Sequence, residues 1–195
     1  PYILNTASLT NQTAFPLSWT DEAESGAASY EVEQLSQEEA DTFSYTLYGN
    51  AATSSQKKFG AASLHFDGTG DYGILTEQTA LRPFISLTDN WTIDFWVKHT
   101  DHAGAEYYIS EFKDLNNYWA LCHSHRNGIR LFMFSGGTQV LDTGFGGEIT
   151  DTNWHHITVA KVGNGVGIYK DGVQVGYGKM NGAISYKGTY NLGHS

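Results

Sequence analysis

The chain has 195 residues, among them 22 Gly, 5 Trp, 12 Tyr, 10 Phe and a single Cys, and its formal net charge is −10. The negative charge argues against nucleic acid and anionic membranes as partners, since both are bound through basic patches. One cysteine cannot form an intrachain disulfide, and no stretch approaches the ~20 apolar residues of a membrane-spanning helix. The glycine and aromatic content favours many short strands joined by tight turns.

The start of the chain differs in composition from the rest. Residues 1–14 are polar, and we interpret them as an N-terminal arm or linker that precedes a single domain at residues 15–195, with a first strand at 15–19. Residues 21–41 hold eight acidic residues and no Lys or Arg. This segment is interpreted as a solvated loop or, alternatively, as a cation site or a docking surface for a basic partner. The chain does not begin with Met, so we expect it to be processed or part of a longer polypeptide.

Apolar residues recur at every second position over a series of short segments, which is the period of a strand with one buried face. Turn residues separate the segments, most clearly Asp171-Gly172, because both central residues of a two-residue hairpin turn must reach positive φ. We therefore predict an all-β antiparallel fold. Its strands are expected at residues 42–48, 62–66, 72–75, 91–99, 107–112, 118–125, 129–134, 156–162, 166–170 and 173–175. Residues 49–58 are expected to form a turn region, and residues 144–147 a surface loop.

Three phrases occur in order along the chain. They are KFGAASLHFDGTGDY at residues 58–72, WTIDFWVK at 91–98, and WHHITV at 154–159 followed by IYKDGV at 168–173. Together they resemble the laminin-G-like, concanavalin A-like jelly-roll family over roughly residues 43–193. The resemblance implies a two-sheet jelly-roll β-sandwich. Relatives usually end in a further strand that closes the sheet, and here we expect residues beyond 195, the N-terminal arm or a neighbouring chain to fill that place.

A glycan site needs an aromatic platform with hydrogen-bonding groups beside it. Trp119, His123 and His125 share one face of the strand predicted at residues 118–125, and Arg126 follows at the turn. We interpret these four as the candidate ligand-binding residues. His123 and His125 would also suit the start of a zinc site, but spacing identifies no further ligand.

Two aspartates flank a glycine-rich turn. Asp67 and Asp71 either set this turn through bonds to their own backbone or, as the resemblance implies, contribute to a calcium site at the rim of the sandwich. No cofactor is certain, and calcium is the candidate. In relatives the last strand often supplies part of that acidic pair, so its absence here weakens the calcium interpretation.

The resemblance extends to glucanases, whose retaining mechanism requires two carboxyl groups about 5–5.5 Å apart. Those relatives carry an E-x-D-x-x-E strand, whereas the corresponding strand here offers only Asp94, with Thr92 and Trp96 as its same-face neighbours. Cys122 lies in the middle of a predicted strand, where a lone cysteine usually behaves as a small buried hydrophobe. We predict that the chain is not an enzyme.

These observations favour a lectin-like, non-catalytic glycan-binding or adhesion module. We expect it to be displayed on a virion, or on an extracellular or bacterial cell surface, with a carbohydrate or cell-surface glycan as its partner. The alternative is a structural or decoration protein that mediates assembly through contacts with neighbouring subunits. A glycoside hydrolase of the glucanase type is the third interpretation.

Overall fold

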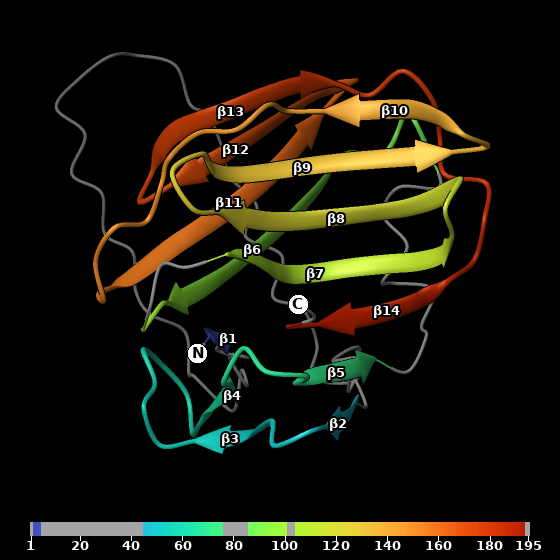
Figure 1. The fold of residues 1–195 in the computed structure, drawn as a ribbon. Helices are drawn as coiled ribbons and strands as arrows, with labels where there is room; N and C mark the ends of the chain where they lie inside the picture. Colours follow the sequence, from blue (N-terminus) through green and yellow to red (C-terminus); the bar gives the residue numbers. More distant parts are fainter. Residues whose placement is uncertain (1, 5–44, 76–85, 101–103, 194–195) are drawn as a thin grey trace, which may run out of the picture.

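Three antiparallel sheets make up the computed structural model, which describes residues 2–4, 45–75, 86–100 and 104–193 (Figure 1). The largest sheet has seven strands in the order β10 (Thr138–Asp142), β9 (Gly128–Ser135), β8 (Asn117–Ser124), β7 (Ala105–Asp114), β14 (Thr189–Leu192), β5 (Tyr72–Leu75) and β2 (Tyr45–Tyr48). The second has four strands in the order β13 (Val173–Lys179), β12 (Gly165–Lys170), β11 (Trp154–Val162) and β6 (Trp91–Lys98). A third, small sheet holds β1 (Tyr2–Leu4), β4 (Ser63–Phe66) and β3 (Ala52–Ser54).

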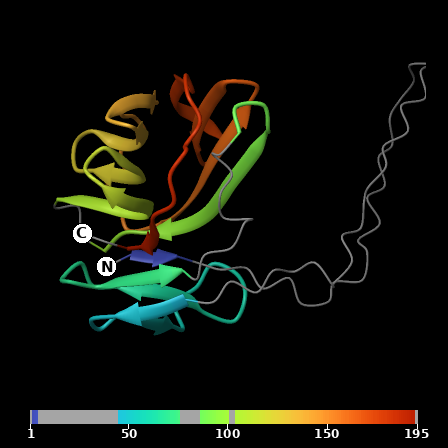
Figure 2. The same cartoon turned by 90° about the vertical axis from the view of Figure 1, so that its right-hand side faces the viewer.

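The seven-stranded and four-stranded sheets face each other, and the small sheet lies at one end of this sandwich (Figure 2). Alternation along each strand sends every second side chain into the space between the two large sheets. Leu121 and Leu131 of the larger sheet and Ile157 and Val159 of the smaller one belong to one buried cluster, each at most 1% exposed. Burying a side chain of this size stabilises the fold by about 1.5–3 kcal/mol. The fold is therefore an all-β jelly-roll sandwich, as the sequence predicted.

The hairpin predicted at Asp171-Gly172 is confirmed. The φ angles of these residues are 52° and 81°, and they join β12 to β13. The Asp171 backbone N–H donates to the His156 carbonyl (2.8 Å), and the Asp171 carboxylate accepts the His156 N–H (2.9 Å). The turn is thus fixed to the start of β11 as well as to its own strands.

Most strand predictions are confirmed, including the two faces of β6, where Phe95 and Val97 are buried and Asp94 is exposed. One expectation was wrong. Residues 52–54, placed in a turn region, form β3 because they pair with β4. The segment at 144–147 is a surface loop, as expected, with Gly144 and Phe145 exposed. It is attached to both large sheets, since Gly146 exchanges backbone hydrogen bonds with Ile129 and a Cβ on Gly146 would lie 2.0 Å from the Val175 carbonyl oxygen.

The N-terminal residues that are described pair with the small sheet. β1 runs antiparallel to β4, with Tyr2 opposite Phe66, and it also contacts β6. β14 is paired on both sides, by β5 and β7, so it is an inner strand of the seven-stranded sheet. The strand predicted at 15–19 and the acidic segment at 21–41 lie outside the described residues. In the described part of the chain, no helix has the length and apolarity needed to cross a membrane.

Candidate functional site: an aromatic groove on the seven-stranded sheet

The outer face of the seven-stranded sheet carries a row of large aromatic side chains beside a row of small ones. Cross-strand register places Phe112, Tyr118 and Phe134 in line on β7, β8 and β9. The next row on the same face holds Ser110, Ala120 and Phe132, and it continues through Asn191 and Ile74 on β14 and β5. Because Ser110 and Ala120 are short, the face is hollowed between the aromatic side chains.

This hollow is a groove of about 800 Å³ that crosses the strands from β9 to β5. Phe112 is 48% exposed, and Leu115, in the turn between β7 and β8, is 84% exposed. Exposed apolar patches of this kind usually mark binding sites. The residues that line the groove are Tyr72, Ile74, Tyr107, Ser110, Glu111, Phe112, Lys113, Leu115, Tyr118, Trp119, Ala120, Phe132, Thr189 and Asn191.

The aromatic rings of the groove are held in place by one another. Tyr118 stacks on Phe134 with ring centroids 5.0 Å apart and an interplanar angle of 13°, and it meets Phe132 edge-to-face at 5.9 Å. At the opposite end, Tyr72 stacks on Tyr48 at 4.8 Å. Such pairs favour fixed ring orientations, so the walls of the groove are preorganised.

The one carboxylate among the described groove-lining residues points into the sandwich. Glu111 is 1% exposed; its Oε2 accepts the Trp119 indole N–H (2.9 Å) and its Oε1 accepts the Gly188 backbone N–H (2.8 Å). Glu111 therefore supports the floor of the groove from below and is not available to a ligand.

At the β9–β10 end of the sheet, Arg130 lies between two aromatic rings and an acid. Its Nε and Nη2 donate to the two carboxylate oxygens of Asp142 (2.8 and 2.5 Å), and its Cζ is 5.0 Å from the ring centroids of both Phe132 and Phe145. The hydrogen bond with Arg130 lowers the pKa of Asp142 and raises the pKa of Arg130. Since Phe132 also lines the groove, Arg130 lies next to a residue of the groove.

The four residues singled out from the sequence are not brought to one surface. Trp119 and His123 do share a face of β8, as predicted, but it is the inner face, and they are 1% and 0% exposed. His125 and Arg126 lie beyond the end of β8 in an exposed turn, where Arg126 has a φ of 66° and its N–H donates to Glu148. Of these four, only Trp119 is among the residues that line the groove, and its side chain is 1% exposed.

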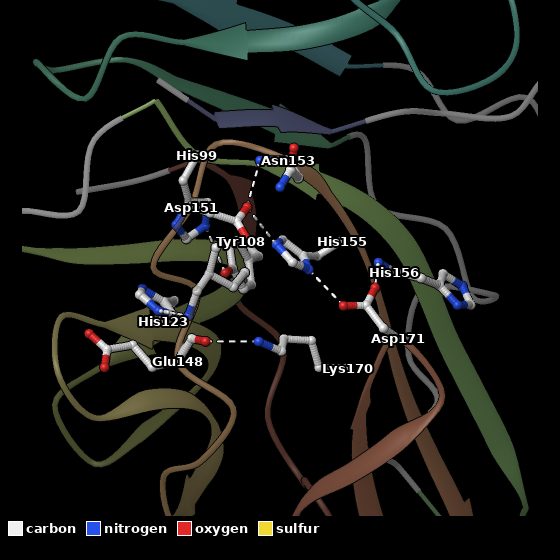
Figure 3. A network of polar contacts seen from close by, with 11 residues as sticks. His99, Tyr108, His123, Glu148, Asp151, Asn153, His155, His156, Lys170 and Asp171 are labelled. Atoms are coloured by element: carbon white, nitrogen blue, oxygen red, sulfur yellow. Dashed lines mark hydrogen bonds and ion pairs between the residues drawn. The ribbon is translucent and has the colours of Figure 1, made fainter.

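His123 belongs instead to a buried polar cluster with His99 and Glu106 (Figure 3 shows His99, Tyr108 and His123). The Ile149 backbone N–H donates to His123 Nε2 (3.1 Å), so the ring proton resides on Nδ1, which donates to Glu106 (2.7 Å). His99 is hydrogen-bonded through Nε2 to the Tyr108 hydroxyl (2.9 Å). Donor atoms of these two His and Glu106 lie within 4.8 Å of one another. Both nitrogens of His123 are already engaged, and a metal ion would have to displace one of these bonds.

The two aspartates considered for calcium close a turn. Asp71 is 1% exposed and accepts the backbone N–H groups of Asn50 and Asp67, both at 2.7 Å. Asp67 accepts the Asn50 amide (2.5 Å) and the Thr69 N–H (2.8 Å), and the Asn50 bond is the main reason that its pKa is lowered. All four carboxylate oxygens therefore have a donor from the chain, and a calcium ion here remains an expectation from the sequence.

The His155 ring lies between two carboxylates, that of Asp151 in the loop before β11 and that of Asp171 in the β12–β13 turn (Figure 3). Its Nδ1 lies 2.6 Å from Asp171 Oδ2 and its Nε2 lies 3.1 Å from Asp151 Oδ1, so both ring nitrogens are within hydrogen-bond distance of a carboxylate. Burial pushes the pKa of Asp171 up, but the hydrogen bonds from His155 and the His156 backbone outweigh it and lower the pKa. The pKa of Asp151 is lowered mainly by the Asn153 N–H, and also by His155.

The lowered pKa values predict acid-sensitive stability. A carboxyl group whose pKa is lower in the folded state stabilises the fold above its ordinary value of 3.8 and loses that contribution as the pH falls through the folded pKa. We expect the free energy of unfolding, measured by urea titration, to fall below about pH 4. Asp142→Asn and Asp171→Asn should each flatten this dependence. If the free energy of unfolding of a variant fell with pH as steeply as that of the wild type, the substituted carboxyl group would not be a source of the acid sensitivity.

A two-layer antiparallel sandwich with a groove across its larger sheet defines a lectin-like jelly-roll domain. A profile of the Laminin_G_3 family, described as the concanavalin A-like lectin/glucanases superfamily, matches residues 67–194. Since this is more than half of the chain, the protein belongs to that superfamily. No curated protein matches its sequence.

Two solved structures are similar to this chain. One is domain 4 of AbnA, an extracellular GH43 arabinanase from Geobacillus stearothermophilus, in complex with arabinotriose, with 17% identity, a TM-score of 0.57, and 76% of this chain and 72% of that chain covered. The other is the binding domain of botulinum neurotoxin DC in complex with rat synaptotagmin II, with 14% identity, a TM-score of 0.58, and 77% of this chain covered. This chain spans 38% of the neurotoxin domain. At such identities the likeness shows the shared fold.

Proposed function

We propose that this domain binds an oligosaccharide in the groove of the seven-stranded sheet. The observation that carries this proposal is the groove itself, an exposed hollow with preorganised aromatic walls and small or polar residues between them. Sugar rings present apolar C–H faces that pack on aromatic rings, while Ser110, Thr189 and Asn191 offer hydrogen bonds to hydroxyl groups.

The size of the groove supports an extended ligand. From β9 to β5 it crosses four strand spacings, about 19 Å. That length exceeds a single sugar residue and suits a chain of several. The similar arabinanase domain was solved with a trisaccharide, arabinotriose, which is consistent with an oligosaccharide on this fold.

We propose that binding is not accompanied by hydrolysis. A retaining glycosidase needs two carboxyl groups about 5–5.5 Å apart at the bond that is cleaved. Among the described groove-lining residues the single carboxylate is Glu111, and both of its oxygens accept hydrogen bonds inside the sandwich. Release of reducing ends from a bound oligosaccharide would overturn this part of the proposal.

The test is a glycan array followed by calorimetric titration with the best-bound oligosaccharide. Tyr118→Ala removes the ring that stacks on Phe134 at the groove wall, and we expect it to weaken binding by about 1–2 kcal/mol, roughly tenfold. Tyr177→Ala is the matched control, because Tyr177 is 54% exposed on β13 of the other sheet. Equal affinities of the two variants would place the glycan elsewhere.

An assembly role is the second candidate function. For glycan binding and for assembly alike, we propose display on a virion or an extracellular surface. The assembly role is favoured by β2, which forms one edge of the seven-stranded sheet and leaves Tyr45 and Tyr48 39% and 40% exposed. Edge strands of this kind can pair with another chain. A defined oligomer in light scattering that dissociates on Tyr45→Lys substitution would support this role; a monomer would exclude it.

A further inference from the structure

A guanidinium group with unused hydrogen-bond donors lies beside Phe132, one of the residues that line the groove. Asp142 binds Arg130 through Nε and Nη2, and Phe132 and Phe145 stack against it. Within the described part of the chain Asp142 is the only hydrogen-bond acceptor for Arg130. The Nη1 donors and one Nη2 donor are thus left for a ligand, and the side chain is 26% exposed.

Asp142 has no such spare capacity. Its Oδ1 accepts Arg130 Nε and the Gly144 N–H (2.9 Å), and its Oδ2 accepts Arg130 Nη2 and Gln139 Nε2 (3.2 Å). These four bonds match the roughly four acceptor sites of a carboxylate. Asp142 is therefore a positioning residue for Arg130, and the unused hydrogen-bonding groups of the pair are all donors.

Cationic and acidic side chains both lie near the groove. Lys113 lines the groove, and Lys179 lines a smaller hollow of about 230 Å³ that adjoins Asp142. The carboxylates are Glu111, Asp142 and Asp114, the neighbour of Lys113, and all three already accept hydrogen bonds from the chain. It is therefore the unused donors of Arg130 that favour a negatively charged ligand.

We propose that the oligosaccharide carries carboxylate groups, as in a uronic acid chain, and that Arg130 binds one of them. This inference rests on the proposed glycan groove. The remaining edge of the guanidinium is a planar two-donor fork, which matches the two oxygens of a carboxylate. Stacking on Phe132 and Phe145 and the bond to Asp142 fix that fork before the ligand arrives, so little side-chain entropy is lost on binding.

The experiment compares alginate and polygalacturonate oligosaccharides with cello- and manno-oligosaccharides of the same length, by calorimetric titration. The wild-type protein is expected to prefer the acidic chains, and salt raised from about 50 to about 500 mM should weaken that preference. Arg130→Gln should lower affinity for the acidic chains about tenfold to hundredfold and leave neutral chains within about twofold. Arg130→Lys keeps the charge but loses the fork, so it should also lose most of the preference.

Lys98→Gln, on β6 of the other sheet, is the charge-matched control and should behave as the wild type. Thermal unfolding of each variant establishes that it is folded at the titration temperature. Stronger binding of neutral chains, or an unchanged acidic preference in both Arg130 variants, would overturn this inference and leave the glycan groove standing. Failure of the wild-type protein to bind any of the four chains would overturn both.

Discussion

Replacing His123 by alanine is expected to destabilise the sandwich by about 3–5 kcal/mol, because it leaves a buried carboxylate without its hydrogen-bond donor. His123 is 0% exposed and Glu106 is 3% exposed. The substitution removes the Nδ1 donor to Glu106 and also the Nε2 acceptor of the Ile149 N–H. The free energy of unfolding from guanidinium denaturation measures the loss.

A double-mutant cycle separates the interaction energy of His123 with Glu106 from the cost of the cavity that a smaller side chain leaves. Glu106→Gln keeps an acceptor for His123 and removes the buried charge, so its cost should be well below that of His123→Ala. The double variant Glu106→Leu with His123→Leu replaces both polar partners by apolar groups and should cost less than the sum of its single variants. Additive single costs would mean that Glu106 and His123 do not interact.

His123→Ala also tests the interpretation of His123 as a ligand-binding residue. If His123 acts only inside the sandwich, His123→Ala should bind an oligosaccharide with the wild-type affinity under conditions in which it remains folded. A lower affinity without a loss of stability would instead favour the site predicted from the sequence, with Trp119, His125 and Arg126.

The sequence predicted the strands well because turn residues and the two-residue period are local signals. Asp171-Gly172 and the alternation in β6 depend only on neighbouring residues. The order of the strands within the sheets, by contrast, could not be predicted from local signals. β14 lies between β5 and β7, and β1 pairs with β4, through contacts between residues far apart in the chain that no local pattern encodes.

The groove could not be predicted for two physical reasons. Alternation separates Trp119 from Tyr118 on β8, but both faces of this strand carry apolar or aromatic residues, so the pattern does not say which face is inside. In addition, irregularities in β7 shift its register after Tyr107 and again after Phe112. Simple alternation would place Tyr107 and Phe112 on opposite faces of β7. The first register shift brings both side chains to the groove.

Substituting Gly146 by alanine is expected to cost at least about 3 kcal/mol, since the added methyl group would meet backbone and not a flexible side chain. An ideal Cβ at this position lies 2.0 Å from the Val175 carbonyl oxygen on β13. Gly146 also exchanges two backbone hydrogen bonds with Ile129 on β9 (2.6 and 3.1 Å). Relief of the clash must therefore move β13 away from this segment or break its bridge to β9.

Gly144, two residues away, is the matched control. It has a φ of +67° but no heavy atom within 4 Å of an added Cβ, so Gly144→Ala carries only the left-handed backbone strain of about 1–2 kcal/mol. Denaturation of both variants distinguishes close approach from backbone strain within one segment. A larger loss for Gly146→Ala means that this segment fastens an edge strand of the smaller sheet to the larger one. Equal losses would mean that the close approach of Gly146 to Val175 adds no cost beyond backbone strain.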